Sequence, residues 1–289
     1  MHVNYASIPE TPPATGQPLP SKTPRKRIYV ALGIIAVVAV ALGVTLASMN
    51  GLNLNSSGAG STISLGYNFS PGEEMTYNTT ETISGTINND AQNISVTETF
   101  SLNVISFDGT NYIINLTTTV SVPGPAEVLN VNSTVTEKMN KAGYVTVSNG
   151  MNGTQCPLFG NPFLFFQKDK ATVGENWQVP LSFGNQTASF DGNFTYTFGN
   201  IQNITVPVST YKVFTMNISS NDLTVKMGGT PINPIVFQNV TAQGQVYAEY
   251  GTCRTIESNI QEIINYTSNS INYNETITAQ TMLVKYTKP

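Results

Sequence analysis

The chain shows an alternation of apolar and polar residues with a period of two. Between Met75 and Ile87, apolar side chains such as Tyr77 and Ile83 occupy odd positions, whereas the even positions carry Thr, Asn or Ser. Successive side chains of a β-strand point to opposite faces. The pattern therefore predicts a strand with one face against a core and the other in water.

The same alternation continues in the next two segments, 94–104 and 112–122. Turn-forming residues separate the three segments, first at 88–90 and then at Asp108-Gly109. Short turns between alternating segments are typical of antiparallel strands. We therefore predict a three-stranded antiparallel meander over residues 75–122.

Further segments rich in β-branched and aromatic residues predict additional strands. None of them shows the 3.6-residue period of a helix, and several strands of about thirteen residues would be long enough to twist and curl. We expect a mainly β fold, either an antiparallel curled sheet or a barrel-like sandwich. The additional segments are 129–135, 144–147, 177–183, 190–198, 211–218, 236–240, 246–250, 252–264 and 276–286.

The segment Ile28–Met49 has a different pattern, because it is apolar or small on every side and has no ionisable group except Tyr29. As a helix it would match a hydrocarbon layer of about 30 Å, which predicts a transmembrane span. A buried core helix, a signal peptide cleaved near Ala47 and an archaeal pilin-type signal are the alternatives.

Basic residues fix the expected orientation of this span. Lys22, Arg25, Lys26 and Arg27 precede it, and no Lys or Arg occurs from 50 to 73, which places the N-terminus inside the cell. We expect a disordered proline-rich tail over 1–27, the span over 28–49, a polar linker over 50–66 and an extracellular β domain over 67–289. The expected localisation is a cell membrane, crossed once.

Charged residues make up only 10% of the chain, so another polar group must keep the domain soluble. Fourteen Asn-x-Ser/Thr triplets follow the predicted span, and we interpret them as N-glycosylation sites. Chance alone would give about seven, and the alternative is that Asn and Thr supply the polarity without sugar. The candidates are Asn55, Asn68, Asn78, Asn93, Asn115, Asn132, Asn152, Asn185, Asn193, Asn203, Asn217, Asn239, Asn265 and Asn274.

The strand pattern places several of these sites on the polar face. Asn78, Asn115, Asn132, Asn193 and Asn217 all alternate with apolar neighbours. A close-packed interior cannot hold a glycan. We therefore predict that these asparagines point outwards.

The two cysteines, Cys156 and Cys253, both follow the span, in an oxidising environment where a disulfide is expected. The aromatic segment after Cys156 either fills the core or forms an exposed apolar lip that binds a lipid or another protein. Its candidate lip residues are Phe159, Phe163, Phe165 and Phe166.

The residue content argues against common catalytic designs. The only histidine, His2, lies in the predicted tail, so no histidine-based triad or zinc site can form outside the cell. Nine basic and sixteen acidic residues after Asn50 disfavour nucleic-acid binding. We expect no cofactor, no metal and no enzyme activity, although carboxylates could still meet in a cleft. The candidates for such a pair are Glu73, Glu74, Glu175, Asp191, Glu249 and Glu257.

Three short motifs resemble the periplasmic lipoprotein carriers LolA and LolB. They are a Gly-Glu turn that leads to an aromatic residue in a strand, at 70–77 and again at 172–177, the segment 205–211 before a long strand, and a late Tyr-Gly hairpin at 247–251. The resemblance implies a curled antiparallel sheet around an apolar ligand. The Asn- and Thr-rich composition on an N-terminal anchor also resembles archaeal surface proteins.

These patterns leave two main functions open. The leading hypothesis is a membrane-anchored surface domain with a structural or adhesive role. The alternative is a module that holds a lipid or another apolar ligand on the concave face of its sheet. A closed and well-packed interior would favour the first, whereas an open apolar cavity would favour the second.

Overall fold

The computed structural model describes residues 62–87, 90–123, 128–148, 151–154, 161–184, 188–227, 235–268 and 271–289. These residues form strands joined by turns, and no helix occurs among them, which confirms the mainly β class. No described helix is therefore long and apolar enough to cross a membrane. The predicted tail and the predicted span Ile28–Met49 lie outside the described residues.

Fourteen strands are described, and many are much longer than an average strand. Their bounds are β1 Thr62–Ser64, β2 Glu74–Ile87, β3 Asp90–Phe107, β4 Asn111–Pro123, β5 Val128–Asn140, β6 Tyr144–Ser148, β7 Met151–Thr154, β8 Lys170–Thr172, β9 Asn176–Gly184, β10 Ala188–Thr205, β11 Thr210–Met227, β12 Ile235–Glu249, β13 Thr255–Ser268 and β14 Ile271–Thr287.

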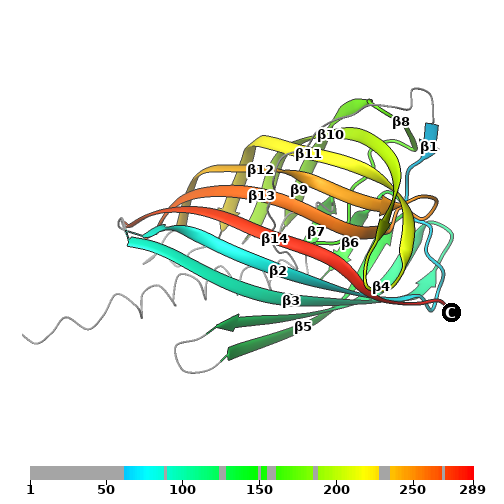
Figure 1. Cartoon of the computed structure of the whole chain (residues 1–289), viewed down its shortest axis with the longest axis horizontal. Helices are drawn as coiled ribbons and strands as arrows, with labels where there is room; N and C mark the ends of the chain where they lie inside the picture. Colours follow the sequence, from blue (N-terminus) through cyan, green and yellow to red (C-terminus); the bar gives the residue numbers. More distant parts are fainter. Residues whose placement is uncertain are drawn as a thin grey trace, which may run out of the picture.

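Twelve of the strands close into an antiparallel barrel, whereas β1 and β8 form a separate two-stranded sheet (Figure 1). The order around the barrel is β10-β11-β12-β13-β14-β2-β3-β4-β5-β6-β7-β9, and β9 returns to β10. Most neighbours in this order are consecutive in sequence, as expected for strands joined by short hairpins. Long strands make up most of the wall, and the short β6 and β7 complete it.

The predicted meander is confirmed, because β2, β3 and β4 are adjacent and antiparallel. Tyr77 lies opposite Phe100, which in turn lies opposite Thr118. Asp108 accepts hydrogen bonds from the backbone amides of Thr110 and Asn111, and this contact shapes the β3–β4 turn. Binding of the Asp108 carboxylate by these amides is the main cause of its lowered pKa of about 2.

Most of the strands are longer than predicted, and the predicted division into segments also differs in two places. The segments 236–240 and 246–249, expected in separate strands, belong to the single strand β12, and Tyr250 lies in the turn that follows. Gly244 lies at the centre of β12, where an added Cβ would stand 2.4 Å from the Asn259 carbonyl oxygen, so this glycine allows close strand contact rather than a turn. The packed region also begins before residue 67, since Ile63 and Leu65 are buried.

Alternation along the strands builds the barrel interior. On β2, for example, Met75, Tyr77 and Ile83 are buried, while Asn78 and Thr80 are exposed. A barrel of twelve strands is wider than the eight-stranded size that side chains fill easily. Large aromatic and methionine side chains therefore point inwards, and they are buried.

One end of the barrel is covered by chain segments that cross it, and we call this the plugged end. Leu65 donates a backbone hydrogen bond to Asp169, and Tyr67 donates one to Lys141. The Tyr67 hydroxyl donates to the carbonyl of Leu164 at 3.1 Å and accepts from its amide at 2.5 Å. The Tyr67 ring also packs against Phe69, Phe163 and Phe166.

Replacement of Tyr67 by Phe should lower the free energy of unfolding by about 2–3 kcal/mol, because both backbone groups of Leu164 would lose a buried partner. Urea denaturation of the full chain in detergent, followed by the fluorescence of the single tryptophan Trp177, measures this loss. The exposed Tyr144 provides the control, since Tyr144→Phe should change stability by less than about 0.5 kcal/mol. Equal stability of the two variants would contradict the proposed role of Tyr67.

Candidate functional site

A largely buried ion pair lies at the plugged end, in the hairpin between β12 and β13. Gly251 and Cys253 both have positive φ, at 97° and 56°, and the Glu249 amide bonds to the Arg254 carbonyl. A left-handed conformation is uncommon for a residue other than glycine. The tight turn carries Arg254 into the barrel, where it is 2% exposed.

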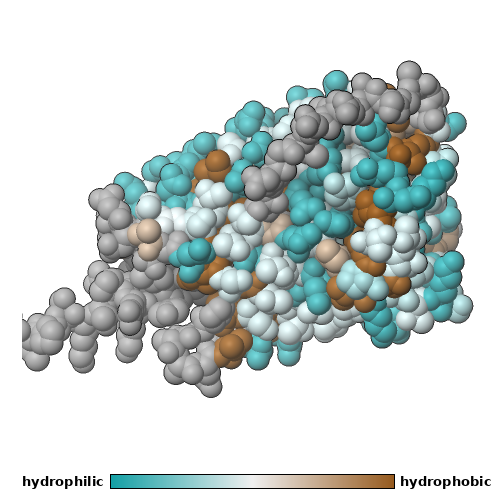
Figure 2. Space-filling view, in the orientation of Figure 1, coloured by the Kyte–Doolittle hydropathy of each residue, from teal (hydrophilic) through white to brown (hydrophobic). Residues whose placement is uncertain are grey.

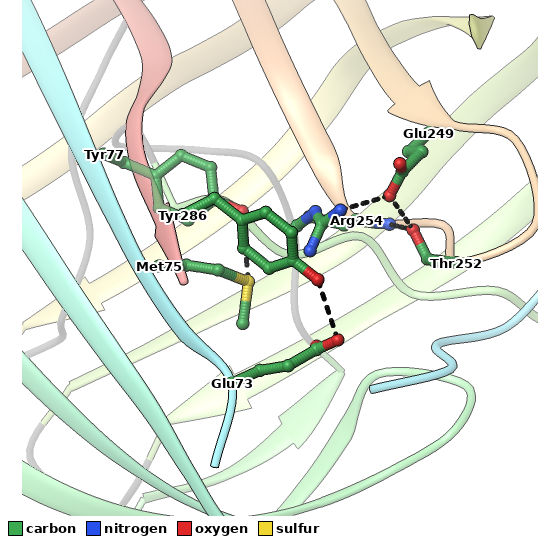
Figure 3. Close-up of polar contacts among 7 residues, drawn as sticks. All are labelled: Glu73, Met75, Tyr77, Glu249, Thr252, Arg254 and Tyr286. Carbon is green, nitrogen blue, oxygen red and sulfur yellow. Dashed lines mark hydrogen bonds and ion pairs between the residues drawn. The ribbon is translucent and has the colours of Figure 1, made fainter. Parts of the chain in front are cut away.

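Four side chains are linked to the Arg254 guanidinium, either directly or through one another, in what we call the Arg254 cluster (Figure 3). Its other members are Glu249, Thr252, Tyr286 and Glu73. Glu249 forms an ion pair with Nη2 and also accepts a hydrogen bond from Thr252. The guanidinium carbon lies 3.6 Å from the centre of the Tyr286 ring, within cation–π range. The Tyr286 hydroxyl donates to Glu73 at 2.9 Å.

The cluster joins parts of the chain that are far apart in sequence. Arg254 and Glu249 belong to the β12–β13 hairpin, Tyr286 lies near the end of β14, and Glu73 comes just before β2. Burial raises the pKa of Tyr286. The hydroxyl is therefore a hydrogen-bond donor rather than a base at neutral pH.

The Arg254 guanidinium is buried, and part of it has no polar partner within the residues that the structure describes. Two guanidinium nitrogens of Arg254, Nε and Nη1, are buried and have no hydrogen-bond partner among the described residues. Because these atoms are closed off from solvent, an anion could reach them only if the surrounding side chains moved. The guanidinium thus links the β12–β13 hairpin to β14 through Tyr286, and Tyr286 in turn links it to the residue before β2, which is a structural role.

Of the six predicted carboxylate candidates, the structure brings only Glu73 and Glu249 into one cluster, where Arg254 and Tyr286 are their partners. Glu175 bonds to Lys168 and to the Thr172 amide in a turn, and Asp191 on β10 accepts from Ser182 on β9. Glu257 accepts from two amide side chains. Glu74 is exposed, whereas Glu73 and Glu249 belong to the Arg254 cluster. Among the described residues, no group of three or more acidic, Cys or His side chains is placed to hold a metal ion.

Sequence reasoning missed a band of glutamates inside the barrel. Glu81, Glu98, Glu262 and Glu275 lie on four adjacent strands and are all less than 5% exposed. Position 81 has the same parity as Tyr77 and Ile83, so the alternation itself could have revealed this burial. The band makes the interior polar in part rather than uniformly apolar.

Glu275 is the clearest member of this band. Tyr266 donates a hydrogen bond to its Oε1 atom at 3.1 Å, while Oε2 is buried without a partner among the described residues. Tyr266 also stacks on Tyr273, with ring centres 4.6 Å apart. Burial raises the pKa of Glu275 from 4.5 to about 7.

Cys253 is buried and carries a free thiol in this structure. It accepts a hydrogen bond from the Gly66 amide at 3.3 Å, and burial raises the pKa of the thiol to about 12. A thiol with a raised pKa is a poor nucleophile. Its predicted partner Cys156 lies outside the described residues, so the disulfide stays a prediction.

The aromatic segment fills the core, and the interpretation as an exposed lip is wrong for its described residues. Phe163 and Phe166 are only 2% and 3% exposed, and Phe165 is partly buried against the core. They pack at the plugged end because Tyr67 and Phe69 offer them an apolar surface that water would otherwise cover. Phe159 lies outside the described residues.

The prediction that the glycosylation candidates point outwards is confirmed wherever burial is described. None of these asparagines is buried, and Asn115, Asn217 and Asn265 are half-buried whereas the others are exposed. Asn55 and Asn185 lie outside the described residues, and the burial of Asn152 is not described. The exposed candidates are Asn68, Asn78, Asn93, Asn132, Asn193, Asn203, Asn239 and Asn274.

Comparison with known proteins gives distant structural likeness only. No family model and no curated protein matches the chain. A Bacteroides fragilis protein assigned as exported, with a YmcC-like fold, has a TM-score of 0.37 and 12% identity over 78% of this chain and 100% of its own. A Parabacteroides distasonis protein assigned as a lipoprotein has a TM-score of 0.36 and 8% identity over 78% and 99%. The compositional likeness to archaeal surface proteins gains no support from these matches.

Replacing Arg254 with Met should lower the free energy of unfolding by about 2–4 kcal/mol, because the ion pair and the stacking on Tyr286 are both lost.

Tyr286→Phe should lower the free energy of unfolding by about 1–3 kcal/mol, since Glu73 loses its hydrogen-bond donor. Urea denaturation measures both effects. The control is Lys212→Met, which removes an exposed cation above the Tyr250 ring and should cost about 0.5–1 kcal/mol at most.

The stability of the barrel should fall as the pH rises between about 4.5 and 7, because folded Glu275 retains a proton that the unfolded chain releases. Glu275→Gln should remove this part of the pH dependence. At pH 8 the variant should be more stable than the wild type by up to about 3 kcal/mol. Unfolding curves at pH 4, 6 and 8 test this, and a variant less stable than the wild type at pH 8 would contradict it.

Proposed function

We propose that this chain is a membrane-anchored extracellular β domain that carries N-linked glycans and has a structural or adhesive role at the cell surface. The observation that carries the proposal is the outward placement of the glycosylation candidates. Eleven of them have a described burial, and none of the eleven is buried. Each is followed two residues later by a Ser or Thr, which shares the same strand face wherever the triplet lies within a regular strand.

The outer surface supports this function in a second way. In Figure 2, hydrophilic and intermediate residues cover most of the described face, and hydrophobic residues occur in small separate groups. With only 10% charged residues, amides and hydroxyls supply most of this polarity. Sugar attached to the asparagines would add hydration that charge supplies in other proteins.

The interior favours a structural role over transport of an apolar ligand. The inward-facing aromatic residues are buried, and segments of the chain itself pack across one end. The glutamate band lines part of the interior with carboxylic groups, and burying such polar groups against an apolar ligand is costly. Lipid binding therefore remains the less favoured proposal.

The experiment is glycopeptide and intact-mass analysis of the protein purified from its native membrane. We expect sugar on the outer-face asparagines, a retained span Ile28–Met49, and loss of one glycan mass in Asn78→Gln. Asn103→Gln is the matched control, because Asn103 lies on the outer face of β3 but has no Ser or Thr two residues later. An unmodified chain, or a mature chain that begins after Asn50, would overturn the proposal.

A further inference from the structure

The barrel wall has a gap in its hydrogen bonding along β5. On one side, β5 pairs with β4 along its whole length, from Val128 to Asn140. On the other side, only Lys138 and Met139 pair with β6. Residues 128–136 therefore have no ladder partner on this second edge among the described residues, and β5 forms the lower border of the sheet in Figure 1.

The sequence of this edge, which is free among the described residues, has none of the strand features that usually prevent strands from joining. Natural edge strands carry Lys, Pro or a bulge, or are very short. Residues 128–136 contain no charge, no proline and no glycine, and their pairing with β4 shows no bulge. Nine residues give an edge of about 30 Å, enough for a strand to pair along it.

The inward-facing side chains of β5 are covered on one side by β4, but no described strand covers them on the other side. Val120 and Leu116 on β4 are 0% and 4% exposed. Val131 and Val135, which lie directly opposite them on β5, are only partly buried. One more strand beside β5, with apolar residues on its inner face, would cover these two valines.

We propose that the free edge of β5 pairs with the same edge of a second copy of this chain. In an antiparallel arrangement centred on Ser133, Val131 of each copy lies opposite Val135 of the other. On the outer face, Asn132 lies opposite Thr134 of the second copy. The inner and outer faces of the two strands therefore match, as a two-fold symmetric contact requires, and no like charges oppose each other.

The proposed pairing deepens the adhesive role, and in that respect it rests on the proposed function. The two-fold axis of an antiparallel strand pair is perpendicular to the sheet, so the two barrels would point in opposite directions. Thr62, the first described residue after the predicted span, would lie at opposite ends of the pair. Such a pair suits copies displayed on two facing surfaces.

The test is the self-association of the full chain in detergent, measured by sedimentation equilibrium. The wild type should form a dimer. The double variant Asn132→Lys with Thr134→Lys places positive charges opposite each other twice, which should weaken association at least about tenfold. A mixture of this variant with Asn132→Glu and Thr134→Glu should associate again, because opposite charges then face each other.

The matched control is Asn78→Lys with Thr80→Lys, which adds the same charges and removes one glycosylation triplet on β2. Because β2 is paired on both sides, this variant should dimerise like the wild type. A wild type that remains monomeric at about 100 µM would overturn the proposal. The proposal would also be overturned if the lysine variant on β5 dimerised as strongly as the wild type, or if the lysine variant on β2 were weakened equally. A mixture of the lysine and glutamate variants on β5 that stays monomeric would overturn it too. A monomeric protein that still carries its glycans and span would overturn only this inference.

Discussion

In a closed antiparallel barrel, each residue of a regular strand points either into the interior or towards the solvent. This two-residue alternation determines where almost every notable side chain of the protein lies. It buries Phe100 and Ile114, and it presents Asn78 and Asn132 to water. The same constraint places Glu81 inside, although a carboxylic acid in that position must be hydrogen-bonded, neutral or both to be tolerated. The inner surface is therefore a compromise between packing and buried acids.

The two ends of the barrel have different physical characters. At the plugged end, Tyr67 and the aromatic segment fill a wide interior, and the Arg254 cluster ties the β12–β13 hairpin to β14 and to the chain before β2. Farther along the barrel, the glutamate band and the Tyr266–Tyr273 pair replace much of the apolar packing. Side chains from the wall can fill the interior of a barrel with fewer strands. A barrel of twelve strands is wider, so chain segments fill one end and long polar or aromatic side chains occupy the rest.

The outer faces of the strands contact water, whereas the edge of β5 offers main-chain groups to another strand. Amides, hydroxyls and candidate glycosylation sites cover the outer faces of the strands, which favours hydration of these faces. The backbone edge of β5 lies at the side of this polar surface, and glycans project from strand faces rather than from the edge. A surface protein of this design can remain hydrated over most of its area and still make a contact through main-chain hydrogen bonds.

The alternation of apolar and polar residues was enough to predict the class of the fold, the β2–β3–β4 meander and the outward position of the asparagines, because a period of two is a local property of the chain. Glycine-containing pairs likewise predicted the Asp108-Gly109 and Tyr250-Gly251 turns. The closure of the barrel, the contact of Arg254 with Tyr286 and the burial of Phe163 and Phe166 became evident only from the folded chain. These outcomes depend on pairings between residues far apart in sequence, and no local pattern records which distant strand will become a neighbour.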